Sequence, residues 1–150
     1  MPYQIQCRTC RAATWADNIV TLLDDHTGPT GRFNCANCNG TDTYIYKSSE
    51  LQEEGEVWER WIKGVIRIDS GIPTYSPYIF LTADTEDGDI NGLHVHYYKD
   101  TRPAGGRLKH GHGPGGPPVL GLNDLFTIIK HLVDAGILSK EAVKDFAAKL

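Results

Sequence analysis

Hydrophobic and polar residues alternate in short stretches of the first fifty residues, which is typical of half-buried β-strands. YQIQ at residues 3–6 and TYIY at residues 43–46 have this character. Residues 14–25 fit two patterns, because their apolar residues lie on one helical face while 19–23 alone also favours a strand. The apolar residues of that helical face are Trp15, Ile19, Leu22 and Leu23.

Aromatic and β-branched residues dominate the stretch from residue 57 to about residue 100, and this composition favours β-structure. The short connections between the strand candidates predict an antiparallel arrangement, either a small sheet or a small barrel. An acidic turn, residues 84–89, separates the last two candidates. The predicted strands are 57–62, 64–68, 76–82 and 93–98.

Two polar stretches interrupt these patterns. Residues 48–56 are acidic and predict a solvated connector or a short polar helix, with a domain boundary inside it. Residues 101–118 are rich in glycine and proline, which break both helices and strands, so we expect no regular element there.

The last segment, residues 122–150, predicts a helical hairpin. Asn123 is a suitable N-cap, Gly136 suits the end of the first helix, and Ser139 suits the start of the second. Each helix then has one apolar face that we expect to be buried. These faces are Leu125, Ile128, Ile129, Leu132 and Val133 in the first helix, and Ala142, Val143, Phe146 and Leu150 in the second.

These elements together predict an α+β protein with three domains. They are residues 1–49, 57–118 and 122–150. The 150-residue chain carries a net charge of −4, and residues 1–60 hold five Lys/Arg against nine Asp/Glu. No apolar run approaches the roughly 18 residues that span a bilayer, and no secretory signal begins the chain. We therefore expect a cytoplasmic protein that does not insert in membranes.

All four cysteines fall in two C-x-x-C pairs separated by 24 residues: Cys7, Cys10, Cys35 and Cys38. Two such turns can complete a tetrahedral shell of four sulfurs around one zinc ion. A closed shell leaves no position for water, so the predicted zinc is structural and contributes to folding. Iron in the same shell, two disulfides or a redox-active pair are the alternatives.

The paired motifs CRTC and CANC, with the strand-like YQIQ, RFN and TYIY around them, resemble a zinc ribbon over residues 3–48. Zinc ribbons serve transcription, translation, protein docking and enzyme scaffolding, so the resemblance implies a fold module rather than one activity. Residues 122–150, with AGILSKE between two helices, resemble the short C-terminal hairpins of bacterial multi-module proteins. That resemblance implies an interaction or oligomerisation element.

Four histidines form a second candidate ligand set. They are His94, His96, His110 and His112. His94 and His96 share one face of a strand, and four imidazoles could bind zinc, iron, nickel or copper. Under this interpretation Leu93, Val95 and Tyr97 face the core. The alternative is that His94 and His96 are solvent-facing strand residues and the loop histidines have no role.

The remaining chemistry favours a binding protein over an enzyme, because no P-loop, GxSxG motif or clear histidine–carboxylate pair is present. The leading hypothesis is a non-enzymatic, zinc-containing interaction or regulatory module, bacterial or from a phage, that binds a protein partner or itself. A metal-dependent enzyme or metal sensor that uses the four histidines is the second. A third is single-stranded nucleic-acid binding by Tyr97, Tyr98 and the basic loop, which the negative charge disfavours. The basic residues are Lys99, Arg102, Arg107 and Lys109.

Overall fold

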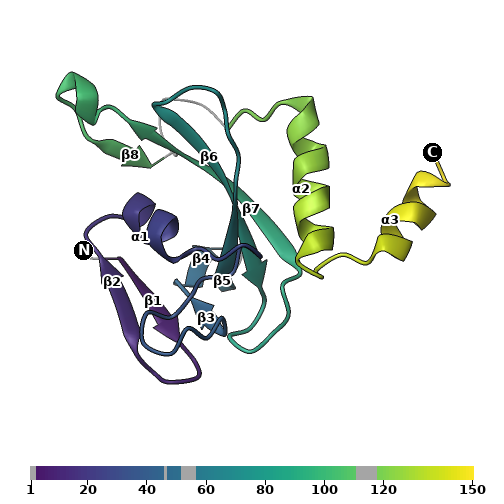
Figure 1. The fold of residues 1–150 in the computed structure, drawn as a ribbon, viewed down its shortest axis with the longest axis horizontal. Helices are drawn as coiled ribbons and strands as arrows, with labels where there is room; N and C mark the ends of the chain where they lie inside the picture. The colour runs from purple at the N-terminus through teal and green to yellow at the C-terminus, as the bar shows by residue number, and fades with distance from the viewer. Residues whose placement is uncertain (1–2, 46, 52–56, 111–117) are drawn as a thin grey trace. The chain divides into compact units, whose positions relative to one another are not determined.

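The structure is a computed structural model that describes residues 3–45, 47–51, 57–110 and 118–150. The chain is α+β and divides into two compact units, residues 1–118 and residues 119–150. The first unit holds two antiparallel sheets and a short helix, and the second holds two helices (Figure 1). None of the helices in the described part of the chain combines the length and apolar character needed to cross a membrane.

The first sheet has three strands in the order β2-β1-β3. They are β1 (Tyr3–Cys7), β2 (Ala13–Ala16) and β3 (Thr43–Tyr44). Helix α1 (Ile19–His26) begins at Asn18, whose side chain accepts a hydrogen bond of 2.9 Å from the Thr21 backbone N–H. The ambiguous stretch 14–25 therefore contains both a strand and a helix, because this cap separates them.

The second sheet has five strands in the order β4-β5-β6-β7-β8. Each strand pairs antiparallel with the one before it along the chain, so the sheet is open and the barrel alternative is wrong. The strands are β4 (Lys47–Leu51), β5 (Val57–Arg67), β6 (Tyr75–Ala83), β7 (Gly92–Asp100) and β8 (Leu108–His110).

β5 is one long strand, where the sequence predicted two strands over 57–62 and 64–68. The pairing with β6 shifts register between Ile62 and Gly64, so the strand continues through an irregularity. A Cβ on Gly64 would lie 2.6 Å from the backbone oxygen of Gly31, which accepts a 2.8 Å hydrogen bond from the Val65 N–H. Glycine is needed here because another segment's backbone approaches so closely.

Both polar stretches contain regular structure that the sequence did not predict. Residues 47–51 form β4 along β5, and residues 108–110 form β8 along β7, after a 3₁₀ turn η2 (Arg102–Ala104). Pairing satisfies backbone hydrogen bonds whatever the side chains are, so a composition-based prediction misses such edge strands. The rest of these stretches, residues 52–56 and 111–117, lies outside the described residues.

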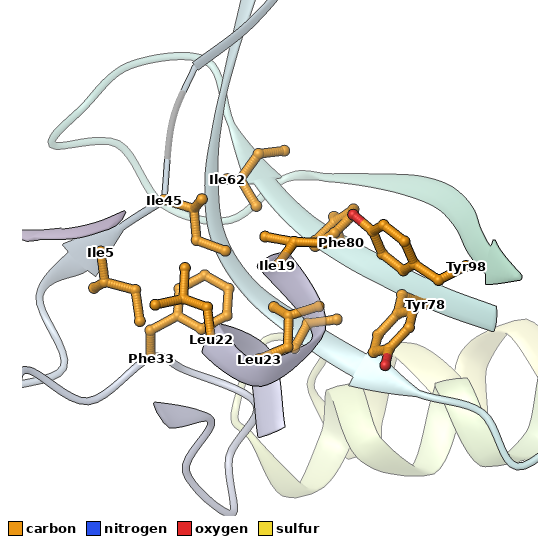
Figure 2. Close-up of a cluster of buried hydrophobic side chains, with 11 residues drawn as sticks. Ile5, Ile19, Leu22, Leu23, Phe33, Ile45, Ile62, Tyr78, Phe80 and Tyr98 are labelled. Atoms are coloured by element: carbon orange, nitrogen blue, oxygen red, sulfur yellow. The ribbon is translucent and has the colours of Figure 1, made fainter. Parts of the chain in front are cut away.

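One hydrophobic cluster joins the first forty-five residues to the five-stranded sheet (Figure 2). The Tyr44 and Trp61 rings add an edge-on contact between the same two regions, with centroids 4.9 Å apart. The predicted boundary between residues 1–49 and 57–118 stays a prediction, and any test of it must account for this shared cluster. Its members are Ile5, Ile19, Leu22, Leu23, Phe33, Ile45, Ile62, Val65, Tyr78, Phe80 and Tyr98.

The second unit holds α2 (Leu122–Asp134) and α3 (Lys140–Ala147). α2 is capped at Gly121, not Asn123 as predicted, because the Asp124 carboxylate accepts a 2.6 Å hydrogen bond from the Gly121 N–H. Gly136 has φ 71° and Ser139 caps α3, as the sequence predicted.

The predicted burial of this unit's apolar faces is largely wrong. α3 has no buried residue, and Phe146 is 63 % exposed. In α2, only Ile128 and Leu132 of the predicted face are buried, while Leu125 is 52 % exposed. Helical periodicity identifies a face, but burial needs a surface to cover that face.

Candidate metal centre

The two C-x-x-C motifs form two turns with the same backbone hydrogen bonds. The Cys7 N–H donates to the Ala12 oxygen at 3.0 Å, and the Cys35 N–H donates in the same way to Gly40 at 2.9 Å. In the first turn, the Cys10 N–H also points at the Cys7 sulfur, at 3.5 Å. A short loop thus places two sulfurs on one side of each turn.

A left-handed residue follows the second cysteine of each turn. Arg11 has φ 63° and Asn39 has φ 57°, the two non-glycine residues with positive φ in the described chain. Asparagine tolerates this conformation, whereas an arginine in it is unusual. The Gln6 side chain donates a 3.1 Å hydrogen bond to the Arg11 oxygen and holds that turn in place.

The four sulfurs meet in one cluster, with all atoms within 4.8 Å of one another. Cys7 and Cys38 sulfurs lie 3.7 Å apart, and Cys10 and Cys35 sulfurs lie 3.6 Å apart. A tetrahedron of sulfurs about 2.3 Å from a central ion has edges of about 3.8 Å, so the spacing fits a metal. All four cysteines are free, so the described structure contains neither of the alternative disulfides.

Protons are divided unevenly among these sulfurs. A hydrogen bond from the Asn37 side chain, helped by the Ala12 backbone, lowers the pKa of Cys10 to about 6. For Cys38 the Gly40 backbone N–H acts to lower the pKa, but the Cys10 sulfur and desolvation outweigh it and raise the pKa to about 12. The raised pKa of Cys38 opposes its ionisation beside Cys10, and a divalent metal between the two sulfurs would remove that obstacle.

The four ligands differ in their access to solvent. Cys7 and Cys35 are each 1 % exposed, Cys10 is intermediate, and Cys38 is exposed. The burial of Cys35 follows from its neighbour Phe33, whose backbone oxygen accepts a 2.7 Å hydrogen bond from the buried Thr43 hydroxyl. One side of the metal cluster is therefore packed in the core and the other faces water.

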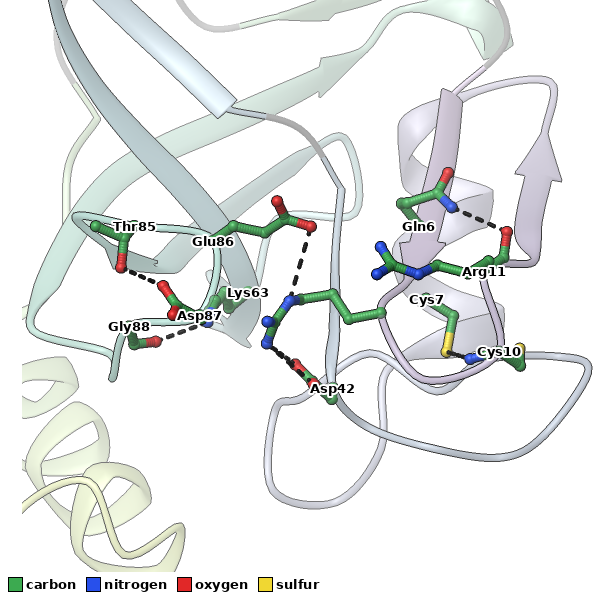
Figure 3. Close-up of polar contacts among 11 residues, drawn as sticks. Gln6, Cys7, Cys10, Arg11, Asp42, Lys63, Thr85, Glu86, Asp87 and Gly88 are labelled. Carbon is green, nitrogen blue, oxygen red and sulfur yellow. Dashed lines mark hydrogen bonds and ion pairs between the residues drawn. The ribbon is translucent and has the colours of Figure 1, made fainter.

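The first cysteine turn is tied to the acidic turn between β6 and β7 (Figure 3). Arg8 donates to Asp42 at 3.1 Å and lies 3.7 Å from Glu86. The ammonium of Lys63, which is 4 % exposed, donates to the Gly88 oxygen at 2.6 Å, and burial lowers its pKa. The acidic turn is thus anchored on the domain, although its composition predicts only a solvated turn.

A buried arginine fixes the two ends of the same turn. Arg60 is 6 % exposed and donates to Thr82, Asp84 and Asn91. Asn91 also donates to Asp84, which completes the network. Sequence reasoning missed both Arg60 and Lys63, since no local pattern marks a charged residue on a strand as buried.

The candidate histidines lie on the opposite face of β7 from the one predicted. His94 pairs with Phe80 and is half-buried on the core side, whereas Leu93 is 45 % and Val95 37 % exposed. The prediction that Leu93 and Val95 face the core is therefore wrong, although Tyr97 is buried as predicted. Alternation has a period of two and does not say which face the rest of the chain will cover.

The histidines are only partly brought together. The His94 and His96 ring centroids are 6.1 Å apart, and His96 meets the Phe80 ring edge-on at 5.1 Å. His110 lies on β8 opposite Tyr98, and His112 falls outside the described residues. Among the described residues, the cysteine quartet is the one group placed to hold a metal ion.

The tyrosines of the nucleic-acid alternative are buried. Tyr97 is 6 % and Tyr98 4 % exposed, and Tyr98 meets Tyr78 edge-on at 5.3 Å. Neither ring presents a free face for a base to stack on. In the adjoining loop, Arg102 is paired with Asp100 at 2.7 Å.

No protein-family model matches this chain, and neither the curated proteins nor the solved structures include one that matches it.

Proposed function

We propose that this protein is a non-enzymatic interaction module whose first forty-five residues are held by a structural zinc ion and whose last thirty-two bind a protein. The donor set supports zinc, since four thiolates at tetrahedral spacing form a shell without an open position for substrate. Iron fits the same shell and is the alternative metal.

The observation that carries the interaction is the exposed apolar surface of residues 119–150. A hollow of about 230 Å³ between the two helices has an almost wholly apolar lining. Other large apolar side chains of α2 also stay exposed, among them Leu122 at 83 % and Phe126 at 71 %. Surfaces of this kind mark interaction sites in soluble proteins. The hollow is lined by Ile129, Leu138, Ala142, Val143 and Phe146.

The test compares two variants with the same change of charge. Phe146→Glu introduces a carboxylate at the hollow, and Lys144→Gln removes one positive charge from a neighbouring exposed site on α3. We expect wild type and Lys144→Gln to self-associate or to retain one identified protein at equal stoichiometry, and Phe146→Glu to lose that complex. Light scattering after size exclusion and quantitative pull-down measure both forms of binding.

The proposal is contradicted if wild-type protein stays monomeric at about 100 μM and Phe146→Glu retains the same proteins as wild type. The zinc component has its own measurement, which is elemental analysis of protein purified without added metal. One zinc per chain would support this component, and one iron per chain would mean that the bound metal is iron.

A metal-dependent enzyme or sensor that uses His94, His96, His110 and His112 is the second candidate. The supporting observation is that His94 and His96 lie on one face with their rings near each other. This candidate requires a second metal that disappears when His94 and His96 are both changed to Ala. Equal metal content in the two proteins would end it.

A further inference from the structure

The four cysteines differ in their exposure to solvent. Cys38 is exposed, while Cys7 and Cys35 are almost fully buried at 1 %. All four sulfurs are thiolates once a metal is bound, so access to solvent decides which of them a small oxidant reaches first. Cys38 is that sulfur, at the outer edge of the centre.

The sulfur that Cys38 touches belongs to the other turn. Its 3.7 Å contact is with Cys7, 31 residues earlier in the chain, and the sulfurs of Cys10 and Cys35 lie within 4.8 Å of it. The second contact, between Cys10 and Cys35, also joins the two turns, at 3.6 Å. The geometry therefore favours bonds between the turns over bonds within a C-x-x-C motif.

We infer that Cys38 is an oxidation site for hydroperoxides, and that its sulfenic acid is resolved by Cys7 with release of the metal. This inference rests on the metal binding proposed above. It does not depend on the interaction surface of residues 119–150.

The reaction has two balanced steps. The Cys38 thiolate attacks one peroxide oxygen, an S–O bond forms, the O–O bond breaks, and hydroxide or alkoxide leaves. Sulfur is oxidised by two electrons and the peroxide is reduced. The Cys7 thiolate then attacks the Cys38 sulfur, an S–S bond forms, and the oxygen leaves as water after protonation. Two ligands are thereby lost, so the remaining pair cannot retain the ion.

The bond between the turns has a different result from a bond within one turn. It ties β1, which ends at Cys7, to the loop after Phe33, and so keeps the two turns together after the metal leaves. A thiol reductant and fresh metal would then restore the starting state. This makes the centre a reversible sensor of peroxide.

The experiment uses the full chain loaded with zinc, because zinc itself takes no part in redox chemistry. Hydrogen peroxide is added at one equivalent, with and without dimedone to trap sulfenic acid. A chromogenic chelator measures released zinc, and peptide mapping without reduction locates the modified cysteines. We expect dimedone on Cys38, a Cys7–Cys38 disulfide without dimedone, and one zinc released per disulfide.

A variant that removes the exposed ligand is compared with one that changes an exposed residue outside the metal centre. Cys38→Ser should lose the fast reaction with peroxide by at least tenfold, while Lys144→Gln should keep it. If either variant fails to bind zinc, the mapping on the wild-type protein decides alone. First labelling at Cys10, a disulfide within one motif, or zinc release without a disulfide would each overturn the inference. These outcomes leave the binding test with Phe146→Glu unaffected.

Discussion

The two units of this protein treat their apolar side chains in opposite ways. In residues 3–110, Phe33 and Phe80 are fully buried in a cluster that spans both sheets and α1. In residues 119–150, Phe126 and Phe146 have the same chemistry but remain mostly exposed. The first unit therefore has a core of its own, while large apolar side chains of the second stay exposed. Under the function proposed above, this difference separates the residues that stabilise the fold from those that bind a partner.

Removal of the proposed zinc ion should have the largest effect on folding, and this effect should be confined to the first unit. Structural zinc contributes about 10–16 kcal/mol to folding in small zinc modules. We expect a chelator to abolish hydrogen-exchange protection in β1 and β3, which flank the cysteine turns, and to leave α2 unchanged. Exchange measured by mass spectrometry on the full chain reports both. A chelator saturated with calcium is the control, and unchanged exchange in β1 would contradict the prediction.

Phe33→Ala should come next. The side chain is fully buried, so its loss should lower the free energy of unfolding by about 3–5 kcal/mol. Denaturant unfolding followed by Trp fluorescence measures the change. A loss below about 1 kcal/mol would mean that Phe33 is not part of a tight core.

Two glycines, one in each unit, separate steric from conformational requirements. Gly64→Ala places a methyl group against the Gly31 oxygen and should cost roughly 1–3 kcal/mol. Gly136 has open space around it but a positive φ, so Ala should cost about 1–2 kcal/mol there. Asn at position 136 should recover most of the lost stability, because the loss there comes from the positive φ. Asn at position 64 should recover none, because the loss there is steric. Equal behaviour of the Asn variants would refute this distinction.

Phe146→Ala should have almost no effect on folding. At 63 % exposure we expect a change within about 0.5 kcal/mol, against the large loss at Phe33. The same denaturant measurement applies to both. A loss comparable to that of Phe33→Ala would mean that α3 already packs in the isolated chain, which would break the contrast between the units.

The smallest effect concerns two exposed carboxylates, one in each unit. Hydrogen bonds from Arg102 lower the pKa of Asp100 to about 2, and a hydrogen bond from Lys130 lowers that of Asp134. A lowered pKa in the folded state stabilises the fold above the unfolded value near 3.9, and the contribution is lost as pH falls toward the folded value. Carboxyl NMR titration should therefore find both midpoints below 3.9, with Asp100 at about 2. Midpoints near 3.9 would show that the pairs do not form in solution.

The sequence predicted the cluster of four cysteines better than the buried charges or the edge strands, because much of its geometry is local. A C-x-x-C turn places both sulfurs on one side within four residues, and only the meeting of two turns depends on the fold. Local sequence also located the helix ends at Gly136 and Ser139. The predicted N-cap of α2 at Asn123 was wrong, since the Asp124 carboxylate accepts a hydrogen bond from Gly121 and the helix is capped there, two residues earlier.

Features that depend on contacts between distant segments could not be predicted from local sequence. Which face of β7 meets the core depends on segments distant in sequence, so the sequence assigned His94 and Val95 to the wrong faces of the strand. The buried positions of Arg60 and Lys63 depend on acceptors more than twenty residues away. Strands β4 and β8 exist because a neighbouring strand offers backbone partners, and their own sequences give no sign of it.

The strand order of the larger sheet has a consequence for behaviour at high concentration. Its most apolar strand, β6, lies in the centre, and its edges are its two shortest strands, with the polar sequences KSSEL and LKH. A second chain that pairs with an edge strand can form hydrogen bonds with the backbone of only three or five residues, and most of their side chains are polar. Fibril growth from the YIFL sequence of β6 therefore requires that the strands on one side of β6 first detach.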